Sequence, residues 1–324
     1  MDFKLAIIGL GKWGKNHLRT ANSISEENLV WICDSKNDML TESEKIIVNK
    51  RVKWTSNYKD ILNDTEVNAV IIATPAETHF EIAKKCIEAG KNILVEKPIT
   101  LFVNECRELI ESAAKKNLVL MVGHVLLYHP AILIIKEMLE SGKLGKLQYI
   151  YSNRLNLGVV RTEENILWSF APHDISIIQF LTGCSPENIF ASGASFLQKV
   201  IEDTTVTILK YPNNISAHIF VSWLHPFKEH RLVVIGSEGM VVFEDTLKNE
   251  KLKFYKKGFK NIDGAIEKFD SDYEVINFDN VQPLEEEQKH FFDCVINNKK
   301  PRTDGISALE VLKILEEAGR VMKL

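Results

Sequence analysis

The sequence predicts an α/β protein in which a doubly wound parallel sheet is followed by an α+β domain with a large, mostly antiparallel sheet. Two observations carry this prediction. Short apolar runs alternate with helix-compatible segments through residues 5–124, as in parallel sheets with crossover helices. From about residue 147, long β segments follow one another with few helices between them, which favours antiparallel pairing. We therefore expect two domains, at residues 1–123 and 124–324.

Composition and charge describe an ordinary soluble protein. The 324 residues are 45% hydrophobic and 26% charged, which is enough chain for two domains. The net charge of -4 provides no basic surface for nucleic acid or for an anionic membrane. We therefore expect a small-molecule substrate, with no nucleic acid and no membrane partner.

Cysteine usage and the lack of long apolar runs predict a cytoplasmic protein. The five cysteines are scattered without a CxxC pair, which argues for reduced thiols and against a disulfide framework or a zinc site, so no metal is expected. The first four residues lead directly into a strand-like segment, so we expect no signal peptide. No apolar run is long enough to cross a bilayer.

A glycine-rich turn follows the first strand, at residues 5–10, and precedes a helix-compatible stretch. In this position Gly9 makes the tight turn, Gly11 lets the backbone approach a pyrophosphate, and Gly14 allows the helix to pack closely on the strand. This is the pattern of a dinucleotide-binding Rossmann domain. The cofactor contacts that we expect from the turn are Gly9, Gly11, Lys12, Trp13 and Gly14.

The second strand, at residues 29–34, ends in a carboxylate. At this place Asp34 would accept hydrogen bonds from an adenosine ribose and repel a 2′-phosphate, which favours NAD over NADP. Ser35 lies beside the same ribose, and the charge of Lys36 would soften the preference. The alternative is that Asp34 only caps a helix or stabilises a turn.

Strands and helices continue to alternate up to residue 124. Strands are expected at residues 52–55, 69–74, 92–98 and 118–124, and helices at 15–21, 58–63, 78–89 and 103–116, with Gly90 ending the third helix. Because ligands bind at the carboxyl edge of such sheets, residues there are further cofactor candidates. They are Ala73, Thr74, Pro75 and His79. For His79 a packing or capping role is an equal alternative.

The tripeptide Glu96-Lys97-Pro98 places an amine at the carboxyl end of the strand at residues 92–98. Beside a cofactor that excludes water and carries positive charge, the pKa of Lys97 would fall toward neutrality, so that the amine could exchange a proton with a substrate hydroxyl. The alternative is a surface lysine that happens to follow a strand.

The motifs described above, taken in their order along the chain, resemble those of one known family. The glycine turn, Asp34, Ala73-Thr74-Pro75 with His79, Glu96-Lys97-Pro98 and Gly123-His124 together resemble the glucose-fructose oxidoreductase and inositol dehydrogenase family over essentially the whole chain. The resemblance implies that Lys97 works near the nicotinamide and the substrate hydroxyl, often before a cis proline bond. It adds Glu96, Lys97 and His124 to the cofactor contacts. Many members carry an arginine shortly after the glycine of the sixth strand, where this chain has Tyr128 and His129.

The second half predicts an antiparallel sheet with few helices. Helices are expected at residues 131–140, 284–298 and 305–322, and β segments at 147–157, 189–196, 204–211, 215–224, 231–235, 240–244 and 252–255. This is the expected substrate domain, and its outer face is a candidate interface for a homodimer or homotetramer.

Within this half we predict a helix with Pro172 at its first position that stops at Gly183. His173 would lie in the first turn, where the helix dipole favours a neutral ring that can take a proton. By its order along the chain His173 matches the second-domain histidine of the resembled family. Many members have an aspartate four residues earlier, where this chain has Ser169. We interpret Asp174 as a first-turn dipole partner rather than as a catalytic acid. For His173 the alternative is a buried structural histidine.

A second set of polar residues narrows the resemblance to the branch that oxidises the 3-hydroxyl of UDP-linked N-acetylhexosamines or their uronates. Its substrate-binding residues would be Lys97, Arg154, Asn156, Arg161, Asn165 and His173, with Trp168 covering the sugar or the nicotinamide. The segment from Pro301 to Gly305 adds to this likeness. Arginines suit a diphosphate or carboxylate because they bind in a bidentate manner. The alternative is that Arg154 and Arg161 form surface ion pairs with Glu163 or Glu164.

Together these features predict an NAD-dependent enzyme with Lys97 and His173 as its catalytic residues. It would oxidise a UDP-linked N-acetylhexosamine, UDP-N-acetylglucosamine or its uronate, to a 3-keto sugar for an aminotransferase in polysaccharide biosynthesis. One alternative is a dehydrogenase or reductase of a free sugar, inositol or a deoxysugar nucleotide. Another is a non-catalytic NAD-binding regulator, because a fold does not fix a function.

Overall fold

The computed structural model describes residues 3–47, 49 and 51–323. Met1 and Asp2, on which part of the signal-peptide expectation rests, lie outside the described residues. The chain forms two compact units. The first contains Met1–Tyr128 and Val281–Leu312, and the second contains His129–Asn280 and Lys313–Leu324.

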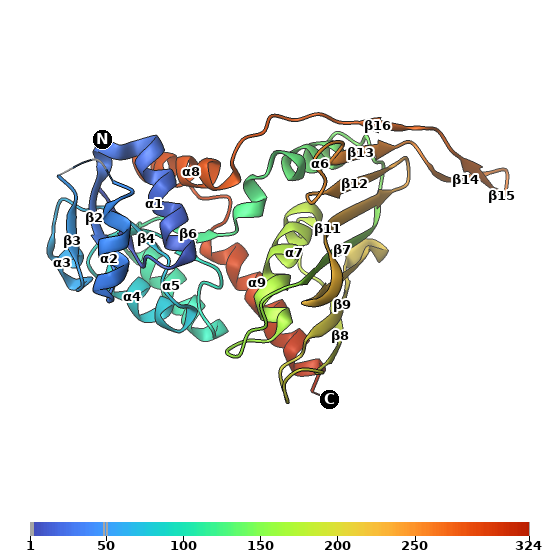
Figure 1. The fold of residues 1–324 in the computed structure, drawn as a ribbon. Coiled ribbons are helices and arrows are strands. Elements are labelled where there is room, and N and C mark those ends of the chain that lie inside the picture. Colours follow the sequence, from blue (N-terminus) through green and yellow to red (C-terminus); the bar gives the residue numbers. More distant parts are fainter. Residues whose placement is uncertain (1–2, 48, 50, 324) are drawn as a thin grey trace. The chain divides into compact units, whose positions relative to one another are not determined.

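The first unit is built on a six-stranded parallel sheet in the order β3-β2-β1-β4-β5-β6 (Figure 1). The strand order reverses between β1 and β4, and sheets of this kind bind ligands at the carboxyl ends of the strands that flank such a reversal. The doubly wound parallel sheet is therefore confirmed. Its strands are β1 (Leu5–Ile8), β2 (Leu29–Cys33), β3 (Lys53–Thr55), β4 (Ala69–Ile72), β5 (Asn92–Glu96) and β6 (Leu120–Gly123).

Helices connect these strands, and some of them were not predicted. They are α1 (Lys12–Ser25), η1 (Glu26–Asn28), α2 (Asn37–Glu44), α3 (Lys59–Asn63), η2 (Ala76–Thr78), α4 (His79–Glu88), α5 (Val103–Lys115) and η3 (Val125–Tyr128). The sequence analysis predicted neither α2 nor the short turns η1, η2 and η3. No sequence pattern indicates α2, because only Leu40 and Ser43 on that helix are buried. Such a short and mostly polar segment has no continuous apolar stripe.

The C-terminal helix α8 (Pro283–Asn297) belongs to the first unit, which differs from the expected division at residues 123 and 124. Phe291 and Phe292 join the hydrophobic core of the parallel sheet, and the ring of Phe292 lies 4.7 Å from the ring of Phe3. The following loop continues along β6, because Val122 N–H donates to the Thr303 carbonyl at 2.8 Å. Residues 281–312 therefore complete this core, although they are far from it in sequence.

The second unit contains an eight-stranded sheet in the order β16-β13-β12-β11-β7-β10-β9-β8 (Figure 1). All neighbouring pairs are antiparallel except β10 with β7, so the mostly antiparallel sheet is confirmed. Its strands are β7 (Leu147–Leu157), β8 (Asn188–Ala194), β9 (Thr204–Lys210), β10 (Ser216–Ser222), β11 (Leu224–Gly236), β12 (Met240–Glu244), β13 (Leu252–Tyr255) and β16 (Tyr273–Val275).

Helix α7 (Ile166–Thr182) packs on β7, β9 and β10, and α6 (Pro130–Glu140) packs on α7. The short turn η4 (Pro212–Asn214) links β9 to β10, and α9 (Gly305–Val321) ends the described helices.

A two-stranded hairpin that the sequence analysis missed extends from this unit (Figure 1). Strand β14 (Gly258–Ile262) pairs with β15 (Ala265–Phe269). Asp263 and Gly264 connect them with φ angles of 49° and 87°. An Asp-Gly pair between two runs of strand-forming residues is a strong hairpin signal, so the sequence did contain the information.

The start of α7 corrects a prediction. The helix begins at Ile166 rather than at Pro172, and Pro172 lies inside it. The side chain of Asn165 caps the helix by accepting the Trp168 N–H at 3.2 Å. The end is as predicted, with Gly183 at φ 69°. His173 therefore lies in the middle of the helix, and the argument that a helix N-terminus keeps its ring neutral is wrong.

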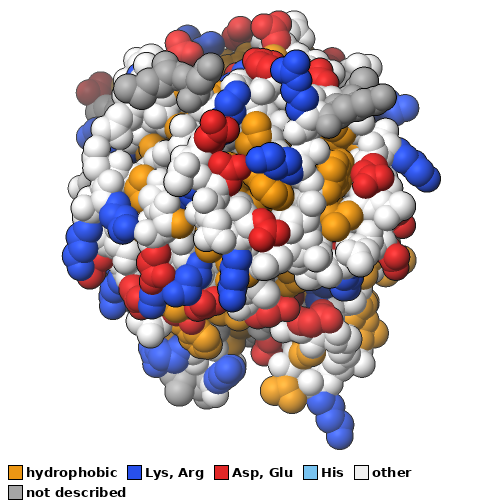
Figure 2. Space-filling view, turned by 90° about the vertical axis from the view of Figure 1, so that its left-hand side faces the viewer, with side chains coloured by type: hydrophobic (Ala, Val, Ile, Leu, Met, Phe, Trp, Pro, Cys, Tyr) orange, Lys and Arg blue, Asp and Glu red, His pale blue; other side chains and the backbone are white. Residues whose placement is uncertain are grey.

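The surface and the cysteines add three observations. No helix among the described residues is both long and apolar enough to cross a membrane. The five cysteines form no disulfide. Figure 2 views the molecule from the side of α2 and α3, and on this face the basic side chains are interspersed with acidic ones.

Candidate active site

The glycine turn of the first unit has the geometry of a diphosphate site. Gly9 has a φ of 97°, and a Cβ there would lie 2.6 Å from the Ala73 backbone. A Cβ on Gly14 would lie 1.9 Å from the Gly9 carbonyl oxygen, whereas a Cβ on Gly11 would meet open space. Gly9 and Gly14 therefore make the turn compact, and Gly11 faces the place that a ligand would enter.

Helix α1 starts directly after this turn, with Gly11 as an N-cap that has no side-chain cap. The first N–H groups of the helix are therefore available to an anion, and the helix dipole favours one. Lys12 and Trp13 are exposed in the same turn. The residues present thus fit the diphosphate of a dinucleotide.

Asp34 stabilises this turn through hydrogen bonds. It also follows β2, where the sequence analysis expects a carboxylate to bind the adenosine ribose. Its Oδ2 accepts the Leu10 N–H at 2.7 Å, and its Oδ1 accepts the Lys36 N–H at 2.8 Å. Each carboxylate oxygen can accept a further hydrogen bond, and the residue is half-exposed beside the exposed Ser35. The turn role and the ribose role are therefore compatible.

His79 ties two strand ends together. Its Nδ1 lies 2.7 Å from the Pro98 carbonyl oxygen, its Nε2 lies 2.8 Å from the Thr74 carbonyl oxygen, and the residue is 1% exposed. Both ring nitrogens thus face backbone groups at the ends of β4 and β5. This geometry favours the packing role that the sequence left open, with Thr74 and Pro98 held in place beside the crevice.

Lys97 follows the last residue of β5, and its bond to Pro98 is cis. The neighbouring Glu96 is buried, and its carboxylate contacts other groups of the protein. Its Oε1 lies 2.9 Å from His17 Nε2, and its Oε2 accepts the backbone N–H of Lys97 at 3.1 Å. Glu96 therefore fixes the backbone from which the Lys97 amine extends.

Two residues behind Glu96 were missed by the sequence analysis. His17 on α1 is fully buried, and its Nδ1 lies 3.0 Å from Nε2 of Gln288 on α8. Burial raises the pKa of the Glu96 carboxyl, but the hydrogen-bonding and electrostatic interactions with His17, and then those with Lys97, outweigh it, so the pKa lies below its usual value. Glu96 is therefore a buried carboxylate. The position of His17, three residues after Gly14 in the predicted helix, was a local sequence signal for a residue near the turn. Gln288 had no such signal.

Two further buried groups interact electrostatically with this carboxylate, and their pKa shifts favour their neutral forms. Burial and then the charge of Lys97 lower the pKa of His124 to about 4. Burial and then the charge of Glu96 raise the pKa of Glu287 well above its ordinary value. Gly123 leaves room for Glu96, because a Cβ there would lie 3.1 Å from Oε2. The carboxylate of Glu96 and the amine of Lys97 thus lie among neutral neighbours.

In the second unit, Arg154 and Asp174 form a bidentate pair. Arg154 Nε and Nη2 donate to the two Asp174 oxygens at 2.8 and 3.1 Å, and Ser152 Oγ donates to Asp174 at 2.6 Å. Asp174 is 1% exposed in the middle of α7, so its interpretation as a first-turn dipole partner was wrong. The expected alternative for Arg154, a surface ion pair with Glu163 or Glu164, is also wrong. Two of its five N–H donors bind Asp174.

The other residues predicted to bind the substrate differ in their contacts and exposure. Asn156 lies two residues after Arg154 on β7, so the two side chains share one face of the sheet. Asn165 caps α7 and also donates to Glu202 Oε2 at 2.6 Å, so it has a structural role. Arg161 is exposed. Trp168 lies against α9, because a Cβ at Gly319 would be 4.0 Å from its Nε1.

His173 is half-buried on α7, one turn after Ser169. Residues four apart on a helix lie on the same face, so Ser169 and His173 are neighbours there. Ser169 thus occupies the helix face on which many members of the resembled family carry an aspartate.

The segment from Pro301 to Gly305 makes structural contacts within the first unit. Arg302 donates to the Leu127 carbonyl at 3.1 Å, and its guanidinium lies 4.7 Å from the Tyr128 ring centroid. Asp304 accepts the Ser307 N–H at 2.8 Å at the start of α9. These contacts account for the segment without a ligand.

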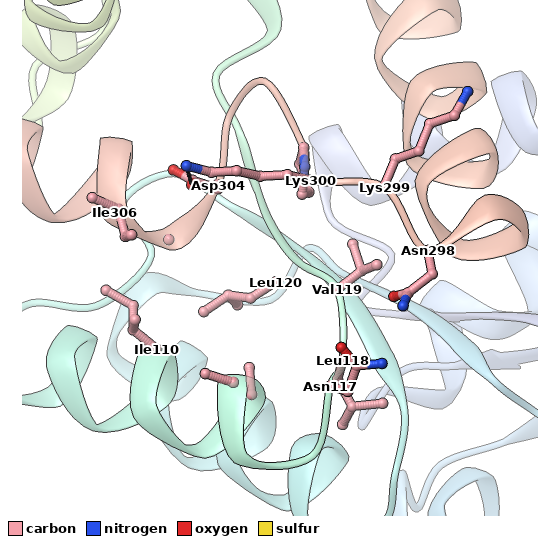
Figure 3. A pocket seen from close by; sticks show the side chains of 14 residues that line it. Ile110, Asn117, Leu118, Val119, Leu120, Asn298, Lys299, Lys300, Asp304 and Ile306 are labelled. Atoms are coloured by element: carbon pink, nitrogen blue, oxygen red, sulfur yellow. Dashed lines mark ion pairs between the residues drawn. The ribbon is translucent and has the colours of Figure 1, made fainter.

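A cavity of about 330 Å³ lies on another edge of the first unit (Figure 3). Ile110, Leu118 and Leu120 line one side of it, and the loop with Lys299, Lys300 and Asp304 lines the other. Lys300 pairs with Asp304 at 3.0 Å, and Lys299 pairs with Asp293 at 2.9 Å. The cavity stands at the amino-terminal end of β6, whereas the glycine turn and Lys97 stand at carboxyl ends. We therefore place the active site elsewhere.

Two family models match the chain. One is described as the oxidoreductase family with an NAD-binding Rossmann fold and covers residues 3–124, and the other is the C-terminal domain of the same GFO/IDH/MocA family and covers residues 132–242. The chain belongs to this oxidoreductase family. The predicted family and the NAD-binding Rossmann domain are therefore confirmed.

Individual members of the family act on different substrates. The scyllo-inositol 2-dehydrogenase (NAD(+)) of Bacillus subtilis (strain 168) is 26% identical over 324 residues, which cover 96% of this chain and 91% of that protein. The UDP-N-acetylglucosamine 3-dehydrogenase of Acidithiobacillus ferrooxidans is 25% identical, with 96% and 95% covered. A solved structure of the latter, GnnA, has a TM-score of 0.84 at 22% identity and covers 100% of this chain and 98% of its own. This structural likeness shows that the fold is shared.

The buried Glu287 predicts a pH dependence of stability. The unfolded chain releases the Glu287 proton above a pH near 4.5, whereas the native state keeps it because its pKa is raised. The native state then binds more protons, so its stability falls as pH rises, by about 1.4 kcal/mol per pH unit until the native pKa is reached. In Glu287→Gln this loss should be absent, so the variant should gain stability relative to wild type as pH rises.

Urea unfolding at a series of pH values measures this difference. Glu286→Gln is the matched control, because Glu286 lies on the same helix but is partly exposed and pairs with Lys289 at 3.1 Å. The control should keep the wild-type slope. Parallel curves for Glu287→Gln and wild type would show that Glu287 is ionised in the native state.

Proposed function

We propose that this protein is an NAD-dependent dehydrogenase that oxidises the 3-hydroxyl of a UDP-linked N-acetylhexosamine. The observation that carries the proposal is the placement of Lys97 at the carboxyl end of β5, in the same unit as a glycine turn that fits a diphosphate. Similarity to a UDP-N-acetylglucosamine 3-dehydrogenase over 96% of the chain supports the substrate. UDP-N-acetylglucosamine and its uronate are the two candidate substrates.

In this proposal Lys97 and His173 reach the same sugar hydroxyl. Bound NAD supplies the acceptor for the hydride of the substrate carbon. Either Lys97 or His173 takes the hydroxyl proton, and the ammonium of Lys97 stabilises the negative charge that develops on the oxygen.

The remaining contacts follow from the geometry of each unit. The dinucleotide would contact Gly9, Gly11, Lys12, Trp13, Gly14, Asp34, Ser35, Ala73, Thr74 and Pro75. The sugar nucleotide would contact the free donors of the Arg154 guanidinium together with Asn156 and Arg161. We also propose that the protein works in the cytoplasm and that the 3-keto product is passed to an aminotransferase for polysaccharide biosynthesis.

Inositol oxidation is the second candidate. It is favoured by the similarity to a scyllo-inositol 2-dehydrogenase, which is 26% identical over nearly the same length. The two candidate substrates can be told apart by charge, because only the UDP-linked sugar has a diphosphate. Guanidinium groups bind a diphosphate strongly, so an enzyme for nucleotide sugars should also bind UDP alone.

Turnover of a substrate panel tests the proposal. Wild type should form NADH with UDP-N-acetylglucosamine or its uronate, and Lys97→Met should be slower by about 10²-fold to 10⁴-fold because the proton-transfer group is missing. Lys84→Met is the control, since Lys84 pairs with Glu108 on the surface. Equal rates in wild type and Lys97→Met would overturn the catalytic assignment. If the enzyme oxidised inositol but neither UDP-sugar, that result would establish the alternative.

We propose that the protein assembles as a homodimer or homotetramer through the open face of the eight-stranded sheet. A row of paired residues crosses four strands on this face: Phe190, Ile208, His218 and Tyr151. Phe190 and Ile208 are 56% and 38% exposed, and the His218 and Tyr151 rings stack at 5.4 Å. A second copy supplies the same apolar surface, which suits a two-fold interface.

Sedimentation tests this assembly. Wild type should sediment as a dimer or tetramer, and Ile208→Glu should shift it toward the monomer because the new charge would be buried. Ile306→Glu is the control, because Ile306 is also an isoleucine and is 54% exposed on the first unit. A monomeric wild type, or equal masses for both variants, would contradict the proposed interface.

A further inference from the structure

A chain of buried hydrogen bonds runs from α8 to the backbone of Lys97. Gln288 Nε2 lies 3.0 Å from the His17 carbonyl oxygen and 3.0 Å from His17 Nδ1. His17 Nε2 lies 2.9 Å from Glu96 Oε1, and Glu96 Oε2 accepts the Lys97 N–H at 3.1 Å. The chain therefore joins three elements, α8, α1 and the end of β5.

The hydrogen-bond directions in this chain follow from one contact. A carbonyl oxygen only accepts, so the Gln288 atom beside the His17 carbonyl is the amide nitrogen. The same NH₂ group then donates to His17 Nδ1, which has to be an unprotonated acceptor. The ring proton of His17 is therefore on Nε2, and it is donated to Glu96. Gln288 thus selects the tautomer of His17 that Glu96 requires.

Burial makes each of these contacts hard to replace. His17 and Gln288 are 0% exposed, and Glu96 is 9% exposed. A buried carboxylate that loses its donors cannot recover them from water. Strand β5 ends at Glu96, so Lys97 is the first residue beyond the strand, and its N–H binds the Glu96 side chain.

We propose that His17 and Gln288 are positioning residues for the Lys97 amine. Helix α8, from the C-terminal part of the chain, sets the His17 tautomer, and His17 holds Glu96 in the orientation that fixes the Lys97 backbone. The inference rests on the proposed function only in that Lys97 is taken as the reacting amine. His17 and Gln288 themselves touch neither substrate nor cofactor in this proposal.

The first test is Gln288→Met, which keeps the size of the side chain and removes both donors. We expect kcat to fall by about 10-fold to 100-fold, because small misplacements of a reacting group have effects of this size. The KM for NAD should change less than twofold, since the glycine turn is untouched. The rate at which acetic anhydride labels Lys97, followed by mass spectrometry without cofactor, should also differ from wild type.

Two further variants make the test specific. Cys294→Ala also changes a fully buried residue of α8 and should keep the wild-type kcat and labelling rate. His17→Gln can still donate to Glu96 and accept from Gln288, so it should retain most of the activity, whereas His17→Leu should lose it. The two His17 variants also test the hydrogen-bonded network if Gln288→Met fails to fold.

The outcomes separate this inference from the proposed function. Equal kcat and equal Lys97 labelling in Gln288→Met and Cys294→Ala, or equal loss in His17→Gln and His17→Leu, would overturn the positioning role. Wild-type turnover by Lys97→Met would instead overturn the proposed function. In that case the Lys97 labelling rate still decides whether Gln288 positions this side chain.

Discussion

The hydrogen bond between His17 and Glu96 is the interaction on which the organisation of the first unit depends. It joins the helix that follows the glycine turn to the strand that carries Lys97, and Gln288 extends it to α8. Burying a carboxylate is unfavourable unless its oxygens are satisfied, and here His17 and the Lys97 N–H satisfy them. Helix α1, the end of β5 and α8 are thus joined by buried hydrogen bonds next to the candidate catalytic amine. Residues 281–312 complete it.

The buried ionisable groups around Glu96 differ in the direction of their pKa shifts. The pKa of Glu96 is lowered although the residue is buried, whereas burial raises the pKa of Glu287 and lowers that of His124, which favours their neutral forms. A buried group keeps its charge only when partners compensate for the lost water, and Glu96 has these partners. The carboxylate therefore has a defined orientation, which a solvent-exposed glutamate would lack. Such preorganisation is what a proton-transfer site needs, because the reacting amine has to be in place before the substrate arrives.

Much of the fold and several site residues could be predicted because their signals are local in sequence. Continuous apolar runs predicted the parallel strands, and the glycine spacing predicted the turn at Gly9. Contacts between distant segments could not be predicted in this way. The pair of Arg154 with Asp174 and the contact of Gln288 with His17 leave no local pattern, and the latter spans 271 residues. The start of α7 was missed for a different reason, because Pro172 was taken as a first position although Asn165 already provided a cap.

The account depends most on one spatial claim, that the Lys97 amine and the His173 imidazole act on the same hydroxyl group. A crystal structure of the complex with NAD and UDP-N-acetylglucosamine tests this claim most directly. The account predicts the Lys97 Nζ and one ring nitrogen of His173 within hydrogen-bonding distance of the sugar 3-hydroxyl, with the nicotinamide against the same carbon. A complex in which either nitrogen points away from that hydroxyl would contradict it.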